Sequence, residues 1–176
     1  MIFVGIILAV LVALLRGGKL ARLSDLGLKF LPLVWLVLLM RSLVAVLEGR
    51  GLPWAPWLQV AAYLILLGVL WLNLAAPGMK LFGLGSFLNF LAIAANGGAM
   101  PVSRSALDLL NMNITPSGTH TLLTAESRLP FLTDIIPLWM PYPQVISVGD
   151  IVLVAGMFLF IQQKMLAGGR LVSAEK

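Results

Sequence analysis

Cysteine is absent from the 176-residue chain, and charged residues make up only 11% of it. Without cysteine, the chain forms no disulfide, holds no thiolate metal site and has no cysteine nucleophile. Histidine occurs once, which argues against a zinc site unless carboxylates supply the other ligands. Hydrophobic residues account for 60% of the chain, and the mean hydropathy is +1.02. These values are typical of an integral membrane protein and not of a water-soluble domain.

Five apolar stretches predict an all-α integral membrane protein, in which five transmembrane helices form one membrane domain over residues 1–176. The predicted spans cover about residues 2–16, 26–47, 57–74, 81–96 and 147–165. Ser24 or Asp25 is expected to cap the second span, and Pro32 to lie in its first turns. The first stretch lacks a basic leader and a small-x-small cleavage site, so we interpret it as a retained helix rather than a signal peptide.

Basic residues are distributed unequally between the two sides of the predicted bundle. With the N-terminus outside, the inner side receives eight of them: Arg16, Lys19, Arg22, Lys29, Lys80, Lys164, Arg170 and Lys176. The outer side receives three: Arg50, Arg104 and Arg128. This bias predicts an outer N-terminus and a cytoplasmic C-terminus. It also explains the net charge of +5 without a nucleic-acid partner. The expected partner is the lipid bilayer, with a larger membrane complex or a homo-oligomer left open.

The segment 97–146 is predicted to form an ordered extracytoplasmic cap that contains short amphipathic helices. Ser103–Leu110 has the pattern of such a helix, with Ser103 as its N-cap. Leu129–Pro143 is apolar but contains four prolines, so it cannot form a straight span. We expect this stretch to lie at the level of the lipid headgroups and to cover the outer end of the bundle.

Polar residues within the predicted spans gather in the outer leaflet, whereas the inner half is almost purely apolar. The outer group comprises Arg41, Gln59, Asn89, Asn96 and Asp150. Arg41 lies about 9 Å below the outer end of its span, at a rise of about 1.5 Å per residue. An arginine at this depth needs an acceptor. Asp150 is the first choice, Asp134 of the cap the second and a bound anionic ligand the third, with Glu48 a weaker candidate because it is close to water.

The fourth span carries Gly85, Asn89, Ala92 and Asn96 at the spacing of one helix face. This stripe indicates either close helix packing with interhelical hydrogen bonds or the wall of a ligand cavity. Both interpretations place the stripe inside the bundle.

Three further places in the chain have both a structural and a functional interpretation. Gly97 is expected to end the fourth span in a left-handed conformation, and Gly97 and Gly98 also leave room for a ligand to approach the backbone. Ser147 and Asp150 form the pattern of a capping box, and Asp150 alternatively pairs with the buried arginine. His120 is either a loop residue at the surface or a proton-exchanging or ligand-binding residue at the outer rim.

Three motifs carry a resemblance to a known family: residues 96–103 (Asn-Gly-Gly-Ala-Met-Pro-Val-Ser), residues 132–137 with Asp134 and residues 147–150 (Ser-Val-Gly-Asp). With them the chain resembles a domain-of-unknown-function family of small bacterial multi-pass membrane proteins. The resemblance implies the bacterial inner membrane as the location, and it assigns no catalytic residue and no cofactor.

The leading functional hypothesis is a non-enzymatic membrane protein with a polar pocket in the outer leaflet. Such a protein binds a small ligand or a lipid headgroup, or serves as an accessory subunit of a larger membrane complex. The alternative is a membrane enzyme or transporter that acts on a lipid-linked substrate at the outer leaflet. Isolated carboxylates and the lack of a visible repeat disfavour this alternative. No residue is predicted to be catalytic or to bind a metal.

Overall fold

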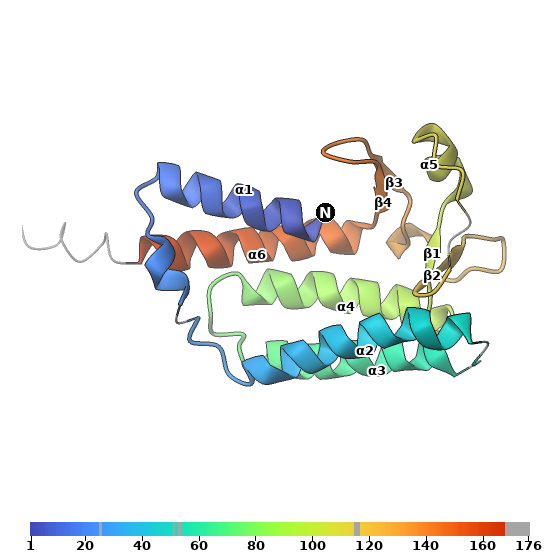
Figure 1. Ribbon diagram of the computed structural model, residues 1–176, viewed down its shortest axis with the longest axis horizontal. Coiled ribbons are helices and arrows are strands. Elements are labelled where there is room, and N and C mark those ends of the chain that lie inside the picture. Colours follow the sequence, from blue (N-terminus) through green and yellow to red (C-terminus); the bar gives the residue numbers. More distant parts are fainter. Residues whose placement is uncertain (25, 51, 53, 115–116, 168–176) are drawn as a thin grey trace, which may run out of the picture.

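Figure 1 shows the computed structural model of the protein, which describes residues 1–24, 26–50, 52, 54–114 and 117–167. Within these residues, the long helices are α1 (Ile2–Leu15), α2 (Leu31–Gly49), α3 (Ala55–Trp71), α4 (Met79–Ala95) and α6 (Val148–Leu166). They run roughly along one direction, and a cap made from residues between α4 and α6 lies at one end of them (Figure 1). The prediction of a mostly helical chain is confirmed.

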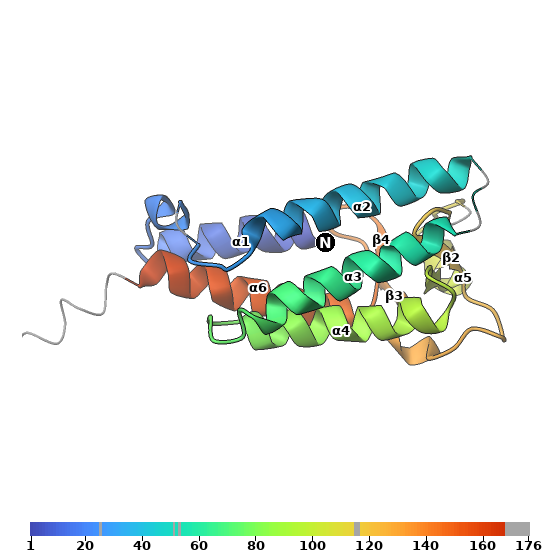
Figure 2. The same ribbon diagram turned by 90° about the horizontal axis from the view of Figure 1, so that it is seen from below.

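The long helices pack side by side in an order that differs from their order in the chain. Helix α6 packs between α1 and α4, and α3 packs between α4 and α2. Figure 2 shows the α2–α3 pair beside α4 from a second direction. One buried cluster joins α1, α3, α4 and α6 far from the cap, and includes Ala9, Leu70, Met79 and Phe160. A second cluster, with Tyr63, Ile93 and Met100, lies beneath the cap.

Helix α2 begins at Leu31 and not at residue 26, so the predicted start of the second span is wrong. Ser24 does not cap this helix, because its hydroxyl donates to the Ala21 carbonyl at 2.7 Å, while Asp25 lies outside the described residues. The side chain of Asn73 instead holds the turn before α2, accepting from Lys29 N at 2.8 Å and donating to Lys29 O at 3.0 Å. Pro32 is the second residue of the helix, where its missing N–H costs nothing.

The cap contains two small sheets, which corrects the predicted all-α class. Strands β1 (Met100–Val102) and β2 (His120–Leu122) pair in parallel, and β3 (Ile136–Leu138) and β4 (Gln144–Ile146) pair antiparallel. Each strand has three residues, too few for the alternation that identifies a strand in a sequence. A bridge between Val102 and Asp134 links the first sheet to the segment before β3. The 3-10 turn Pro130–Leu132 packs against α4 and α6.

Helix α5 (Arg104–Leu109) occupies the predicted position in the cap, and Ser103 is its N-cap as expected. The Ser103 hydroxyl accepts a hydrogen bond from Ala106 N at 3.3 Å. The cap is therefore ordered by helix capping and strand pairing, although the chain has no disulfide.

By length and composition, α6 is the helix in the described part of the chain that is long and apolar enough to cross a membrane. Helices α1, α3 and α4, and residues Leu31–Val44 of α2, are apolar but shorter. The predicted set of five spans therefore stays a prediction, although a helix lies in each predicted range.

Candidate functional site

Asn89 of α4 joins the first turn of α6 in a closed set of hydrogen bonds. Its Nδ2 donates to Asp150 Oδ1 at 2.9 Å, and its Oδ1 accepts from the Ser147 hydroxyl at 2.8 Å. The predicted capping box of Ser147 and Asp150 is confirmed, with both reciprocal hydrogen bonds present. Both polar ends of Asn89 are thus used between helices, which favours the packing interpretation of this residue.

The predicted stripe includes Gly85, but sequence reasoning missed three further glycines, Gly78, Gly149 and Gly156, that together with it let α4 and α6 approach closely. A Cβ atom on Gly85 would come within 2.3 Å of Leu153 N, and one on Gly156 within 2.2 Å of Phe82 N. Gly78 and Gly149 face the same interface. A Cβ atom on Gly78 would meet the Gly156 carbonyl, and one on Gly149 would meet the side-chain amide of Asn89. Gly78 and Gly85 are seven residues apart in the sequence, and so are Gly149 and Gly156. Because α4 and α6 are antiparallel, this shared spacing is the feature of the sequence that could have indicated the close packing.

The Asn96-Gly97-Gly98 turn ends α4 and anchors the cap. Gly97 has φ +72°, the predicted left-handed conformation, and Gly98 N donates to Ile93 O at 2.9 Å. The Asn96 side chain pairs with the backbone of Arg128, donating to its carbonyl and accepting from its N–H, both at 2.8 Å. A Cβ atom on Gly98 would lie 2.5 Å from the Pro56 carbonyl. These contacts are all within the protein and assign the turn a structural role.

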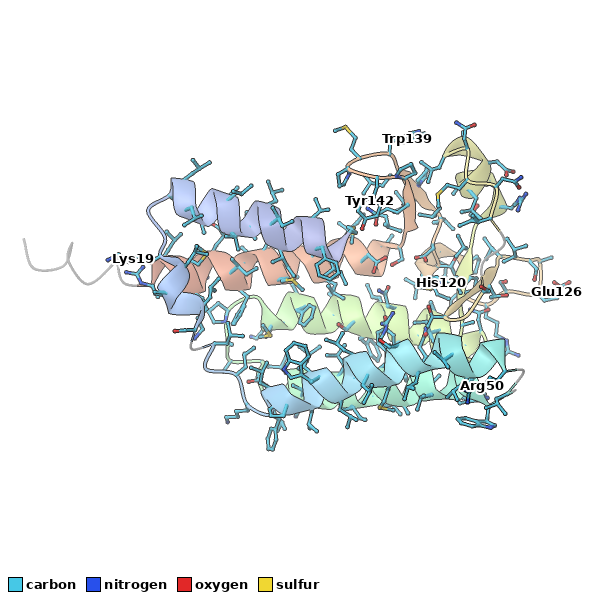
Figure 3. All side chains as sticks on the ribbon, in the orientation of Figure 1. Lys19, Arg50, His120, Glu126, Trp139 and Tyr142 are labelled. Atoms are coloured by element: carbon cyan, nitrogen blue, oxygen red, sulfur yellow. The ribbon has the colours of Figure 1, made fainter. Side chains whose placement is uncertain are left out.

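His120 and Asp134 line a cap pocket of about 350 Å³. Its other walls come from β1, α5 and the loop after it, and the start of β4, and they are mostly apolar. His120 Nε2 lies 3.6 Å from Asp134 Oδ2, slightly beyond hydrogen-bond distance. His120 Nδ1 lies 2.9 Å from the Thr119 hydroxyl. We call this cavity the cap pocket, and Figure 3 shows His120 at the junction of the cap and the helices.

Asp134 is held by its backbone, while its side chain is short of partners. Asp134 N donates to Pro101 O at 3.0 Å, and Asp134 O accepts from Ser103 N at 2.8 Å. The residue is only 5% exposed, and its Oδ1 has no hydrogen-bond partner among the described residues. Burial, reinforced by the negative charge of Asp150, raises the pKa of Asp134 to about 8. The carboxyl group is therefore mainly protonated at neutral pH and can donate a hydrogen bond.

The imidazole of His120 is also neutral at pH 7. Its surroundings lower its pKa below 6.5, first through burial and then through the positive charge of Arg41, while Asp150 acts in the opposite direction. The ring edge still reaches the surface, since the side chain is 44% exposed. The 3.6 Å contact between His120 and Asp134 is thus a contact between two neutral groups and not an ion pair at this pH.

The Arg41 guanidinium does not form the predicted ion pair with Asp150. It lies over the ring of Tyr63, 5.1 Å from the ring centre, so it faces α3 rather than the outside. The guanidinium has no hydrogen bond or ion pair among the described residues, and the side chain of Glu48 lies outside them. The first-choice acceptor is wrong: Asp150 accepts instead from Asn89 and from Ser147 N. The second choice, Asp134, faces His120 instead.

Gln59 of α3 links the bundle to the cap and also has an unused polar atom. The residue is 1% exposed, and its Nε2 donates to Thr119 O at 3.4 Å. Its Oε1 has no hydrogen-bond partner in the part of the chain that the structure describes.

The predicted polar residues thus divide into two sets. Gln59, Asn89, Asn96, Gly97 and Gly98 hold elements together, whereas Arg41, His120, Asp134 and Asp150 influence one another's charge at the base of the cap. Among the described residues, no group of three His, Asp or Glu side chains is arranged to hold a metal ion.

Comparison with known proteins identifies a family but no activity. Residues 25–162 match a family described as a family of unknown function (DUF5317). An uncharacterised protein of Thermotoga maritima is 39% identical over 116 residues, which cover 64% of this chain and 67% of the relative. No solved structure matches the chain. The family match extends from the segment before α2 to the last turns of α6, and the chain therefore belongs to the DUF5317 family.

Proposed function

We propose that the chain is a multi-pass protein of the bacterial inner membrane, with the cap outside and the C-terminus in the cytoplasm. The outward faces of the long helices support this location. Phe3, Trp35 and Leu39 are 78%, 70% and 57% exposed, and most of their neighbours on α1 and α2 are also large and apolar. A helix in water normally carries polar residues on its exposed face. Lipid is the environment that suits these faces.

The distribution of charge and the helix lengths support the same location. Figure 3 shows Lys19 at one end of the helices, and Arg50, His120 and Glu126 at the other. Helices α3 and α4 have 17 residues each, and α2 and α6 have 19. At about 1.5 Å per residue these helices are about 26–28 Å long, close to a hydrocarbon core of about 30 Å. Helix α1 has 14 residues, and local thinning of the bilayer accommodates so short a helix.

The function that the cap geometry supports best is non-enzymatic binding of an anionic group, on a small molecule or on a lipid headgroup. The observation that carries this proposal is the Arg41 guanidinium, which faces Tyr63 and has no described acceptor. Its charge reaches the cap pocket, because it lowers the pKa of His120 in the pocket wall. A protonated Asp134 and a neutral His120 add hydrogen-bond donors without adding negative charge. A phosphate or carboxylate suits this set of donors.

The accessory-subunit hypothesis ranks second. It requires a polar stripe on the outside of the bundle that a partner protein would bury. The stripe of Gly85 and Asn89 instead packs against α6 within the chain. The apolar outer faces of the helices suit contact with a partner protein as well as contact with lipid.

A membrane enzyme acting on a lipid-linked substrate is the candidate from another class. The contact of His120 with Asp134 in the pocket wall, together with the Thr119 hydroxyl 2.9 Å from His120 Nδ1, favours it. An enzyme of this kind would depend on His120 for turnover of a lipid-linked substrate. The proposed binding of an anion depends mainly on Arg41.

Thermal unfolding of the purified protein in detergent tests the binding proposal. The probes are inorganic phosphate, short-chain phosphatidylglycerol and short-chain phosphatidylcholine. We expect phosphatidylglycerol, and not phosphatidylcholine, to raise the unfolding temperature, and stabilisation by phosphate alone would identify a free anion as the ligand. Arg41→Gln should abolish stabilisation by phosphate and reduce stabilisation by phosphatidylglycerol. Arg50→Gln is the matched control, because Arg50 directly follows α2 and is exposed. An unchanged response in Arg41→Gln, or no response to either anion in the unsubstituted protein, would contradict the proposal.

A further inference from the structure

An apolar groove of about 470 Å³ lies between the end of α3 and the start of α4. This end of the helices is opposite to the cap (Figure 1). Leu70 and Leu74 form one wall, Leu84 and Phe87 form the other, and Lys80 is the single charged residue in the lining. The groove is separate from the cap pocket and shares no residue with it.

Gly83 keeps the groove open. A Cβ atom at this position would have only ordinary contacts, 3.9 Å from Leu74 Cδ2 and 4.0 Å from Leu70 Cβ. Gly85, two residues further along α4, faces the tightly packed backbone of α6. Gly83 thus faces the groove and is not required for the packing of α4 on α6, so a larger side chain there would fill the groove without displacing a helix.

Lys80 and Trp71 mark one end of the groove with the residue types found at a membrane surface. Both residues are in the lining, and Trp71 is 74% exposed. Lys80 is exposed, and its ammonium group has no ion pair or hydrogen bond with any residue that the structure describes. Lys19, also exposed, lies at the same end of the molecule. Tryptophan and lysine at a helix end suit the headgroup level, and a positive charge there attracts anionic lipid.

We propose that this groove binds one acyl chain of an anionic phospholipid of the inner leaflet, with the lipid phosphate at Lys80. The inference rests on the proposed membrane location and is independent of the ligand in the cap pocket. Charge complementarity selects the occupant: the apolar walls suit an acyl chain, and the ammonium group of Lys80 suits a phosphate. A symmetric second copy is disfavoured, because its own Lys80 would bring a like charge to the same interface.

Quenching of Trp71 by brominated lipids measures occupancy of the groove. The full chain is reconstituted into phosphatidylcholine vesicles containing brominated phosphatidylglycerol or, at the same mole fraction, brominated phosphatidylcholine. The signal of Trp71 is the difference between the unsubstituted protein and Trp71→Phe. We expect an about five-fold preference for phosphatidylglycerol, which corresponds to about 1 kcal/mol for one lysine at the membrane surface.

Two variants and two controls locate the effect. Lys80→Gln should remove the preference for phosphatidylglycerol, and Gly83→Leu should reduce quenching by both lipids. Gly68→Leu on α3 is the control, because a Cβ atom at Gly68 meets no atom within 4 Å and Gly68 does not line the groove. Arg41→Gln should leave quenching at Trp71 unchanged, since Arg41 belongs to the other end of the bundle.

The outcomes separate this inference from the proposed function. Equal quenching by the two lipids would overturn the inference while leaving the membrane location intact, and so would full quenching in Gly83→Leu. Absence of quenching at every tryptophan would overturn the membrane location as well.

Because the chain has no native cysteine, Gly83→Cys gives a cross-linking probe without background. Efficient cross-linking of two copies through this cysteine would identify a second copy as the occupant and overturn the lipid.

Discussion

Asn89 Nδ2 donates to Asp150 Oδ1 at 2.9 Å, and this hydrogen bond ties the middle of α4 to the first turn of α6. The same amide accepts from the Ser147 hydroxyl, so its loss leaves Asp150 Oδ1 and the hydroxyl hydrogen of Ser147, the N-cap of α6, without a partner among the described residues. We expect Asn89→Ala to lower the free energy of unfolding by about 1–3 kcal/mol, the cost of unsatisfied buried polar groups. Denaturant or thermal unfolding in detergent measures it. Asn113→Ala, at an exposed loop position, is the control and should change stability little.

The close approach of α4 and α6 predicts opposite effects for two glycines on the same helix. Gly85→Ala places a methyl group 2.3 Å from Leu153 N and should destabilise the protein by about 1–3 kcal/mol. Gly83→Ala meets no atom closer than 3.9 Å and should be neutral or stabilise the helix by up to about 1 kcal/mol. The comparison of the two unfolding temperatures tests the helix interface. Equal effects would show that the two helices do not touch at Gly85.

Features set by neighbouring residues could be predicted from the sequence. The capping box at Ser147 and Asp150 and the N-cap at Ser103 depend on residues three apart, and both are confirmed. The left-handed conformation of Gly97 follows from its place after a helix, and it too is confirmed.

Features that join distant segments could not be predicted. The sequence predicts an ion pair between Arg41 and Asp150 because an arginine within a span needs an acceptor. No local pattern indicates that Asn89 donates to Asp150 instead. The contact of His120 with Asp134 depends on three-residue strands in an irregular cap, which leave no periodicity in the sequence.

Gly97 provides a test of the helix end. Its φ of +72° is strained for a β-branched residue, so Gly97→Val should cost on the order of 1–2 kcal/mol although space for the side chain is available. Ala99→Val should cost less. The folded yield of each variant in detergent, by size-exclusion chromatography, is the measurement. Equal yields would mean that the left-handed conformation is not required.

Asp134 should make stability depend on pH. Its pKa is about 8 when folded and near 3.8 in an unfolded chain, so the unfolded chain loses its proton first as pH rises. The free energy of unfolding should therefore fall between about pH 4 and pH 8 and level off above that range. The lowered pKa of His120 has the opposite effect: near and below pH 6.5 it makes the free energy of unfolding rise with pH. Asp134→Asn should flatten the decline toward pH 8. Parallel stability curves for the two proteins would contradict the burial of an acidic Asp134.

The central claim is that the helices cross the membrane and present the cap, with its pocket, to the outside. Labelling of single cysteines in intact cells with a membrane-impermeant maleimide tests it most directly, since the native chain contributes no background. Glu126→Cys and Lys19→Cys place exposed thiols at the two ends of the molecule. Labelling at Glu126→Cys in intact cells, and at Lys19→Cys only after permeabilisation, is the predicted result. Equal labelling of the two cysteines, or the reverse pattern, would contradict the account.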